Sequence, residues 1–509
     1  MNASVIWRVV RAEGVAAALD RFRDRRAEAR RRRSFRPASA PPPGFACAVL
    51  NLAAAAPAPR LGGVQAQLLR RLEAEAALRP VALLYPEAPG GGRGGGYRLE
   101  LQSRRERWAL HLSPGSPGSP GPPAGAAASP GTADMPWRGI APDDPELERA
   151  VAWAVGHCGA TLLQVEGLAA MSLGSLLRLR ENGLRLVLAI HDFAAFCPRP
   201  HLLESLPPPA PPRFCHYSRD APRCARCLGR DVAGAGLPPG FQEGRRELAR
   251  QLLAGAAAIV YPSSFLARTH GELFGDAGSA AAHVIAPAGS PARLRARAPA
   301  PPRPPRHIAW VGAVKPHKGA LVFEAAVRRL AANGRRPRLS AYGGGDAEIL
   351  ARWRRLPGLR VRGYYRAGTL PALLRRDGVD LALLLSVVPE SYGLALDECA
   401  AAAVPVIAFD HGALAERIAA AGSGLLLAAA VVDDPQAAGI ALASLLADLL
   451  DGRLEVPPPP LAPPGQLRPA APPALSAPAA PRPSTAAAAV ADWLALYREL
   501  GLRWPDQAG

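Results

Sequence analysis

Residues 381–416 read LALLLSVVPESYGLALDECAAAAVPVIAFDHGALAE, and this stretch decides the fold. The apolar run Leu381–Leu385 is typical of a buried strand, Leu394–Ala402 predicts a helix, and Pro405–Phe409 predicts a second strand. Strands that alternate with helices predict a parallel sheet covered by helices on both faces. Ligands of such sheets bind beyond the carboxyl ends of the strands, where the polar residues of this stretch lie.

The same alternation runs through two parts of the chain, on either side of a Pro-rich break at 298–306. After the break it covers residues 307–453, beginning with a strand at His307–Val311. Before the break it covers residues 41–297, which include a predicted strand at Leu184–Ile190. Because 509 residues are too many for one core, we expect two α/β domains joined by a hinge. Their facing strand ends would form a cleft.

Residues 1–40 form a separate basic extension. Apolar residues alternate with arginines as in an amphipathic helix, which Gly14 weakens in the middle. Such a helix could pack on its own protein, or residues 1–35 could dock on an anionic membrane surface. Both interpretations stay open at this point.

The C-terminal end combines a Pro/Ala-rich linker at 454–484 with a final segment at 485–509. Residues 486–500 predict a helix with Trp493 and Tyr497 on one apolar stripe. A helix with such a stripe must pack on something. We therefore expect it to cross back to the first domain.

The composition gives a formal net charge of +19 and a pI of about 10.6. A polyanionic partner would explain this charge. A skew towards Ala, Gly, Pro and Arg from a G+C-rich coding sequence also explains it, and we favour this second explanation. Nucleic-acid binding also predicts basic residues interleaved with aromatic ones, but aromatic residues make up 6% and form no such stripe.

The N-terminus is punctuated by arginines and lacks the apolar core of a secretory signal, so the cysteines are expected to stay reduced. In the C-terminal part, the longest apolar run without charge that we find is Ile418–Val432. This run is shorter than the roughly 20 residues that a membrane span needs. We therefore expect a cytoplasmic protein whose membrane contact, if it has one, is peripheral.

Residues 311–319, VGAVKPHKG, place a basic turn between a predicted strand and a helix that opens at Gly319. Helix N-termini bind phosphate through their free N–H groups and the macrodipole. Lys315 and Lys318 would add two compact ammonium charges, and they are the only lysines of the chain. A basic turn that merely caps a helix is the alternative.

Residues 389–398, PESYGLALDE, carry Glu390 before a predicted helix and Glu398 about one turn inside it. Carboxylates accept hydrogen bonds from sugar hydroxyls, as they do from ribose in dinucleotide-binding folds. The backbone amides of Gly393 and Leu394, at the start of the helix, could face phosphates. Two unrelated surface acids are the alternative, although the preceding strand and Gly393 favour a site.

The order and spacing of these elements resemble the donor-binding half of the retaining GT-B glycosyltransferases of family 4. Glu390 and Glu398 stand at the positions of the family's E-x7-E signature, and residues 412–416 resemble its Gly-x3-Glu turn. The resemblance spans about residues 45–430 and is more specific in the C-terminal half. It implies two Rossmann-like domains with parallel sheets facing a cleft, the first on the acceptor side and the second binding the donor.

Three stretches of the N-terminal half resemble further landmarks of this family. They are residues 61–65 (LGGVQ), 191–193 (HDF) and 262–266 (PSSFL). The resemblance implies that Gly62 and Gly63 let the backbone approach the donor phosphate. It implies that His191 is a catalytic residue of the cleft, near the sugar.

In the C-terminal half, the resemblance implies that Lys318 neutralises the donor diphosphate, that Glu390 binds the transferred sugar and that Glu398 binds the nucleotide ribose. One departure concerns the phosphate grip: the family usually has arginine where this chain has Ala313. Lys315 is the candidate to replace it.

The function that follows is transfer of a sugar from a nucleotide-diphosphate sugar to a glycan or lipid-linked acceptor, with retention and without a catalytic metal. Surface polysaccharide or glycoconjugate synthesis is the expected setting. A GT-B nucleotide-sugar epimerase or hydrolase is one alternative. A basic, non-enzymatic binding protein with a zinc module is another.

Four of the seven cysteines fall in a Pro-rich insertion at 197–227. They are Cys197, Cys215, Cys224 and Cys227. Four thiolates suit a tetrahedral structural zinc site, with an iron–sulfur cluster as the second choice. His201 and His216 are candidates for replacement ligands, and reduced cysteines or a redox CxxC pair are the alternatives.

Overall fold

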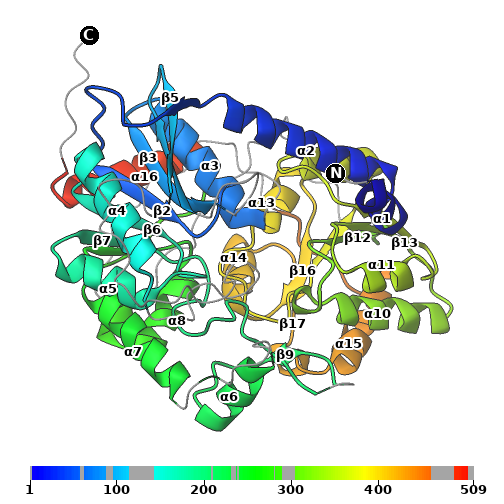
Figure 1. Cartoon of the computed structure of the whole chain (residues 1–509). Coiled ribbons are helices and arrows are strands. Elements are labelled where there is room, and N and C mark those ends of the chain that lie inside the picture. The colour runs from blue at the N-terminus through cyan, green and yellow to red at the C-terminus, as the bar shows by residue number, and fades with distance from the viewer. Residues whose placement is uncertain are drawn as a thin grey trace.

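The structure is a computed structural model that describes residues 3–57, 62–87, 96–113, 143–207, 210–230, 237, 240–279, 281–288, 304–459 and 486–502. Two α/β domains lie next to each other, and a helical N-terminal segment runs along both (Figure 1). The predicted hinge and the predicted Pro/Ala-rich linker lie largely outside the described residues.

The N-terminal domain is built on a nine-stranded sheet. In spatial order the strands are β1 (Arg36–Ala38), β5 (Arg107–Leu112), β4 (Gly96–Gln102), β3 (Val81–Glu87), β2 (Val49–Ala53), β6 (Leu162–Glu166), β7 (Arg185–Ala189), β10 (Ala258–Tyr261) and β11 (Ala282–Val284). Its helices are α3 (Gly62–Ala76), α4 (Pro145–Cys158), α5 (Leu173–Glu181), α7 (Phe241–Ala254), α8 (Ser264–Phe274) and α9 (Asp276–Ser279). The insertion adds β8 (Leu203–Glu204), β9 (Arg213–Phe214) and α6 (Ala221–Gly229).

This first sheet is mostly parallel, as expected, and departs from the expectation only at β4. Strand β4 pairs antiparallel with both β3 and β5. A parallel crossover needs a dozen or more residues. The connections on either side of β4, residues 88–95 and 103–106, are too short for one, so the chain folds into a meander.

The C-terminal domain has a six-stranded sheet that is parallel throughout. In spatial order the strands are β14 (Leu359–Gly363), β13 (Arg338–Tyr342), β12 (His307–Val311), β15 (Leu381–Leu384), β16 (Val406–Phe409) and β17 (Leu425–Leu427). The helices are η1 (Pro316–Lys318), α10 (Ala320–Ala332), α11 (Ala347–Trp353), α12 (Leu370–Asp377), α13 (Leu394–Ala401), α14 (Gly412–Ala421), η2 (Ala429–Val431) and α15 (Pro435–Leu450). Buried strands β12, β15 and β16 end at the loops that carry the predicted site.

The N-terminal extension forms two helices, α1 (Ala3–Glu13) and α2 (Val15–Arg33), which meet at Gly14. It packs on both domains. At the C-terminal domain, the buried Asp24 accepts hydrogen bonds from Tyr364 Oη at 2.6 Å and Arg366 Nε at 2.8 Å. The amphipathic helix thus has an inner face that belongs to the fold.

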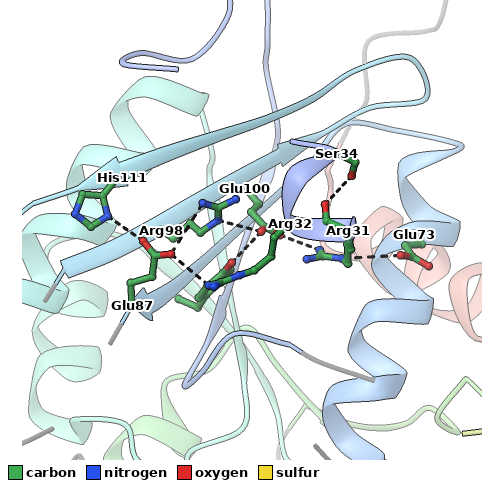
Figure 2. Close-up of polar contacts among 9 residues, drawn as sticks. Arg31, Arg32, Ser34, Glu73, Glu87, Arg98, Glu100 and His111 are labelled. Atoms are coloured by element: carbon green, nitrogen blue, oxygen red, sulfur yellow. Dashed lines mark hydrogen bonds and ion pairs between the residues drawn. The ribbon is translucent and has the colours of Figure 1, made fainter. Parts of the chain in front are cut away.

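The other end of α2 is held by acids of the N-terminal domain (Figure 2). Arg31 donates to Glu100 at 2.8 Å, and Arg32 lies 3.2 Å from Glu87. The chain then enters the sheet, because β1 pairs with β5. The extension therefore supplies an edge strand as well as the predicted helix, and is an integral part of the fold.

The final helix, α16 (Ala486–Glu499), crosses back to the N-terminal domain as predicted. Trp493 and Tyr497 are buried in a cluster with strand residues of the first sheet. Tyr497 Oη donates to Gln164 Oε1 at 2.5 Å, and the guanidinium of Arg79 lies 4.8 Å from the Tyr497 ring centroid. Among the described helices, none has the length and apolar character that a membrane span requires.

Candidate functional site

Residues 312–319, the lysine loop, follow β12 and contain one short helical turn, η1, before α10. Gly319, the residue directly before α10, has φ 81°, a left-handed conformation that favours glycine. A Cβ atom at Gly319 would lie 1.8 Å from the carbonyl oxygen of Leu385. Glycine therefore brings Lys318 against the end of β15, while Lys315 stays exposed.

The loops after β12 and β15 are joined by hydrogen bonds to one carbonyl oxygen, that of His317. It accepts from the Val387 amide at 3.0 Å and from Ser386 Oγ at 3.2 Å. Next to these bonds, the Lys318 ammonium donates to the Glu390 carboxylate. The structure thus brings together the two residues that the resemblance assigns to the diphosphate and the sugar.

Glu390 keeps its negative charge in this environment. Burial acts to raise its pKa, but the charge and hydrogen bond of Lys318 outweigh burial and hold the pKa below its ordinary value. An ionised carboxylate accepts hydrogen bonds from hydroxyl groups. The group can therefore accept hydrogen bonds from hydroxyl groups at neutral pH.

Two further helices begin beside Glu390. The Glu390 carbonyl oxygen accepts from the Ala413 amide in the first turn of α14 at 2.9 Å, and a Cβ at Gly412 would lie 2.7 Å from the Glu390 nitrogen. Gly393, with φ 82°, precedes Leu394 at the start of α13. Because helix N-termini carry partial positive charge, α10, α13 and α14 all favour an anion near this point.

Glu398 lies farther along α13 in a more apolar environment. Burial raises its pKa to about 7, although the Gly368 amide, 3.3 Å from Oε1, and the charge of Arg70 act against the shift. Arg70 belongs to α3 of the N-terminal domain, so this carboxyl group lies where both domains contribute. Sequence reasoning missed Arg70 because its position depends on how the domains pack.

The glycine turn at the start of α3, in the N-terminal domain, lies against the start of α13 in the C-terminal domain. Gly62 and Gly63 open α3. A Cβ at Gly63 would lie 2.4 Å from Leu394 Cδ1. Ser263 Oγ also donates to the Ser391 carbonyl oxygen at 2.6 Å, so two N-terminal landmarks contact the glutamate loop of residues 389–398.

His201 and His317 stack on each other beside Lys318. Their ring centroids are 4.4 Å apart and the planes differ by 16°. Burial is the main cause that lowers the pKa of His317 to about 2, and burial also lowers that of His201, with Lys318 adding to both shifts. Both rings are therefore neutral at pH 7.

Both histidines that were candidates for metal ligands are engaged elsewhere. His201 lies at the lysine loop, and His216 Nε2 lies 2.6 Å from Asp433 of the C-terminal domain. In the sequence, the position of His317 between Lys315 and Lys318 is what indicates that it belongs to the site. Nothing in the sequence pairs it with His201.

His191 lines a pocket of about 440 Å³ in the N-terminal domain. Its Nε2 is 3.7 Å from Glu166 Oε2, and Arg71 Nη2 donates to Glu166 Oε1 at 2.5 Å. Burial acts to raise the pKa of Glu166, but Arg71 and His191 bring it below its ordinary value. Trp493 of the C-terminal helix lines the same pocket.

A clamp that sequence reasoning missed holds the glutamate loop. Arg417 of α14 forms an ion pair with Asp397 and donates to the Tyr392 carbonyl oxygen at 3.0 Å. Its guanidinium also lies 4.0 Å from the Tyr392 ring centroid. Asp397 thus anchors the loop, while Glu390 beside Lys318 remains part of the site.

The four cysteines of the insertion line one cavity. Burial is the main cause that raises the pKa of Cys197 to about 12, and Cys215 and Cys227 add to the shift. Among the described residues, no three His, Cys, Asp or Glu side chains converge closely enough to hold a metal ion as they stand. The predicted cluster is therefore present as a group of neighbouring thiols.

Comparison with known proteins agrees with this architecture. Residues 305–448 match the family model described as glycosyl transferases group 1. No curated protein matches the chain significantly. Sucrose-phosphate synthase from Thermosynechococcus elongatus is 15% identical, with 89% of this chain and 99% of that chain covered and a TM-score of 0.50.

Two other solved structures are similar at lower TM-scores. Trehalose 6-phosphate synthase from Burkholderia multivorans is 12% identical over 90% of this chain and 97% of that chain, with a TM-score of 0.45. HepE from Anabaena in complex with UDP is 13% identical over 80% of this chain and 98% of that chain, with a TM-score of 0.41. The chain has the GT-B fold, and its C-terminal domain matches the group 1 glycosyltransferases.

Proposed function

We propose that the protein is a family 4 glycosyltransferase that moves a sugar from a nucleotide-diphosphate sugar to a glycan or lipid-linked acceptor, with retention at the anomeric carbon. The observation that carries the proposal is the Lys318–Glu390 ion pair at the N-termini of α10, α13 and α14. It combines a cation for phosphate with an anion for sugar hydroxyls. The domain that holds this pair matches the group 1 glycosyltransferases.

The chemistry follows from charge. As the anomeric C–O bond breaks, negative charge grows on the leaving diphosphate, and Lys318, Lys315 and the amides of Gly393 and Leu394 stabilise it. Glu390 holds the sugar hydroxyls, and Glu398 holds the ribose. The acceptor hydroxyl oxygen then bonds to the anomeric carbon on the face that the diphosphate leaves, and its proton passes to an oxygen of the leaving diphosphate. Attack on this face retains the configuration.

The acceptor would enter from the N-terminal domain. The pocket of His191 offers an imidazole, the Arg71–Glu166 pair and the apolar Trp493, a combination that suits a sugar ring. We assign His191 to the cleft near the transferred sugar. Synthesis of surface polysaccharide or glycoconjugate is the proposed setting.

Product analysis tests this function. The protein is incubated with a panel of nucleotide sugars and candidate acceptors, and the anomeric configuration of each product is read by NMR. Transfer with retained configuration supports the proposal. Conversion or hydrolysis of the donor in the absence of acceptor, without transfer when acceptor is added, would identify an epimerase or hydrolase instead.

The raised pKa of Glu398 predicts that stability falls as pH rises. Between its ordinary value of 4.5 and about 7, the folded protein holds a proton on Glu398 that the unfolded chain has lost. The free energy of unfolding should therefore fall by about 3 kcal/mol more in the wild type than in Glu398→Gln between pH 4.5 and 8.

Urea unfolding across this pH range measures the difference. The matched control is Glu455→Gln, which changes an exposed acid just after the same domain and should follow the wild type. Equal pH profiles for the wild type and Glu398→Gln would show that Glu398 is not buried as the structure places it.

We also propose that residues 1–35 hold the enzyme on the cytoplasmic face of an anionic membrane. Trp7, Val15, Leu19 and Phe22 are large apolar side chains exposed on α1 and α2, and Trp7 is 64% exposed. Arg11 lies 5.7 Å from the Trp7 ring centroid, so basic groups flank the apolar ones. This outer face suits anionic lipid while the inner face packs on the protein.

Co-sedimentation with vesicles of mixed phosphatidylcholine and phosphatidylserine checks the membrane proposal. Leu19→Glu combined with Phe22→Glu should reduce the bound fraction at least about tenfold, since each change removes burial worth roughly 1.5–3 kcal/mol and adds a negative charge. Ile440→Glu, an exposed apolar residue of α15, is the control and should bind as the wild type does. Undiminished binding by the double variant would contradict the proposal.

A further inference from the structure

Four thiols of the insertion face one cavity of about 380 Å³. Cys197 follows the buried Phe196, and Cys215 directly follows β9. Cys224 and Cys227 are three residues apart on α6 and so share a face of that helix. Segments separated in the sequence thus present their cysteines to the same space.

The backbone between the second and third cysteine turns back towards α6. His216 and Tyr217 both have a left-handed φ, 50° and 55°, and the Ser218 amide donates to the Cys215 carbonyl oxygen at 3.2 Å. The Cys224 Sγ lies 3.5 Å from the Ser218 carbonyl oxygen. Two successive left-handed residues without a glycine are strained, and they persist where the surroundings hold them.

Cationic side chains surround the cavity. Arg246 Nη2 lies 3.7 Å from Cys224 Sγ and donates to the Ser218 carbonyl oxygen at 2.8 Å. Arg199 and Arg223 line the same cavity, and Arg223 forms an ion pair with Glu204, which also lines it. Four thiolates around one divalent cation leave two negative charges, which neighbouring guanidinium groups would balance.

The cavity is connected to the donor site through the backbone of the insertion. The Cys215 amide donates to the Leu202 carbonyl oxygen at 2.9 Å, and Leu202 follows His201, which stacks on His317 beside Lys318. On the other side of Cys215, His216 pairs with Asp433 of the C-terminal domain. The cysteines therefore lie at the base of a segment that reaches across to the second domain.

We propose that Cys197, Cys215, Cys224 and Cys227 bind one zinc ion as a tetrathiolate, and that this ion fixes the insertion so that His201 covers the lysine loop. The thiols share the cavity without yet meeting as ligands, so binding includes side-chain rotation that brings each sulfur to about 2.3 Å from the metal. The zinc site is independent of the proposed function. Only the role of His201 at the donor site rests on the proposed function.

Elemental analysis of the purified full chain tests the site. We expect one zinc per chain in the wild type and none in Cys224→Ser combined with Cys227→Ser. The control Cys158→Ala removes a buried cysteine of α4 outside the cavity and should keep its zinc. Because the double variant could fail to fold, the wild type is also loaded with Co²⁺, whose absorption in a tetrahedral thiolate site includes sulfur-to-cobalt charge-transfer bands.

Other outcomes would overturn the assignment. Iron with visible absorption would identify an iron–sulfur cluster, and a Cys224–Cys227 disulfide in protein purified without reductant would identify a redox pair. Wild-type protein with neither metal, and without the cobalt bands, would leave four ordinary thiols. Zinc in a protein that turns over no nucleotide sugar would retire the proposed function and leave the zinc site standing.

Discussion

Replacing Lys318 by alanine is expected to lower kcat for sugar transfer by about 10²- to 10³-fold, the usual cost of removing one group that stabilises transition-state charge. The ammonium lies at the N-terminus of α10 and is held there by Glu390. Removing it takes away the cation that would meet the leaving diphosphate. Steady-state kinetics with saturating donor measure the change.

Two matched variants make this prediction specific. Arg335→Ala breaks another ion pair of the same domain, that of Arg335 with Asp451, and should leave kcat unchanged. Lys318→Arg keeps the positive charge but replaces a compact ammonium by a planar guanidinium. We therefore expect its kcat to lie between those of Lys318→Ala and the wild type. Wild-type turnover in Lys318→Ala, with a melting temperature that shows a folded protein, would remove this lysine from the mechanism.

Replacing Gly319 by alanine is expected to lower the free energy of unfolding by at least about 3 kcal/mol and to abolish transfer. The left-handed φ of 81° strains any other residue, and the new Cβ would lie 1.8 Å from the Leu385 carbonyl oxygen. To relieve the overlap, the lysine loop must move away from β15. This movement separates Lys318 from Glu390.

Gly334→Ala is the matched control for this substitution. Gly334 also has a left-handed φ, 74°, but its Cβ would meet no atom within 4 Å. Gly334→Ala should therefore lower the free energy of unfolding by about 1 kcal/mol, through backbone strain alone, and leave sugar transfer intact. Urea unfolding of both variants measures the difference, and equal losses would show that the contact with Leu385 does not matter.

The C-terminal domain could be predicted from the sequence because its strands are short apolar runs that local composition identifies. The strand His307–Val311 has the predicted bounds, and the helix predicted to open at Gly319 begins one residue later. The lysine loop and glutamate loop follow such strands directly. Their meeting at Lys318 and Glu390 is a consequence of strand order, since β12 and β15 are neighbours.

What the sequence did not reveal depends on contacts between distant segments. The stacking of His201 on His317 requires the insertion to reach the second domain, and local composition carries no signal for this. The Arg70–Glu398 interaction depends on how the domains pack. The meander around β4 was not predicted from the sequence. Strands β4 and β5 alternate apolar and polar residues, but they are short and lie between glycine-rich and polar turns, so they were not recognised as strands.

The most direct test of the central claim, that Lys318, Glu390 and Glu398 grip an activated sugar, is donor turnover followed by mass spectrometry across a panel of nucleotide sugars. We predict that the wild type consumes at least one nucleotide-diphosphate sugar when acceptor is present. Folded Lys318→Ala should consume it about 10²- to 10³-fold more slowly, and folded Glu390→Ala should also lose most of the wild-type turnover. A wild type that neither binds nor consumes any member of the panel, or variants that turn over as the wild type does, would contradict the account.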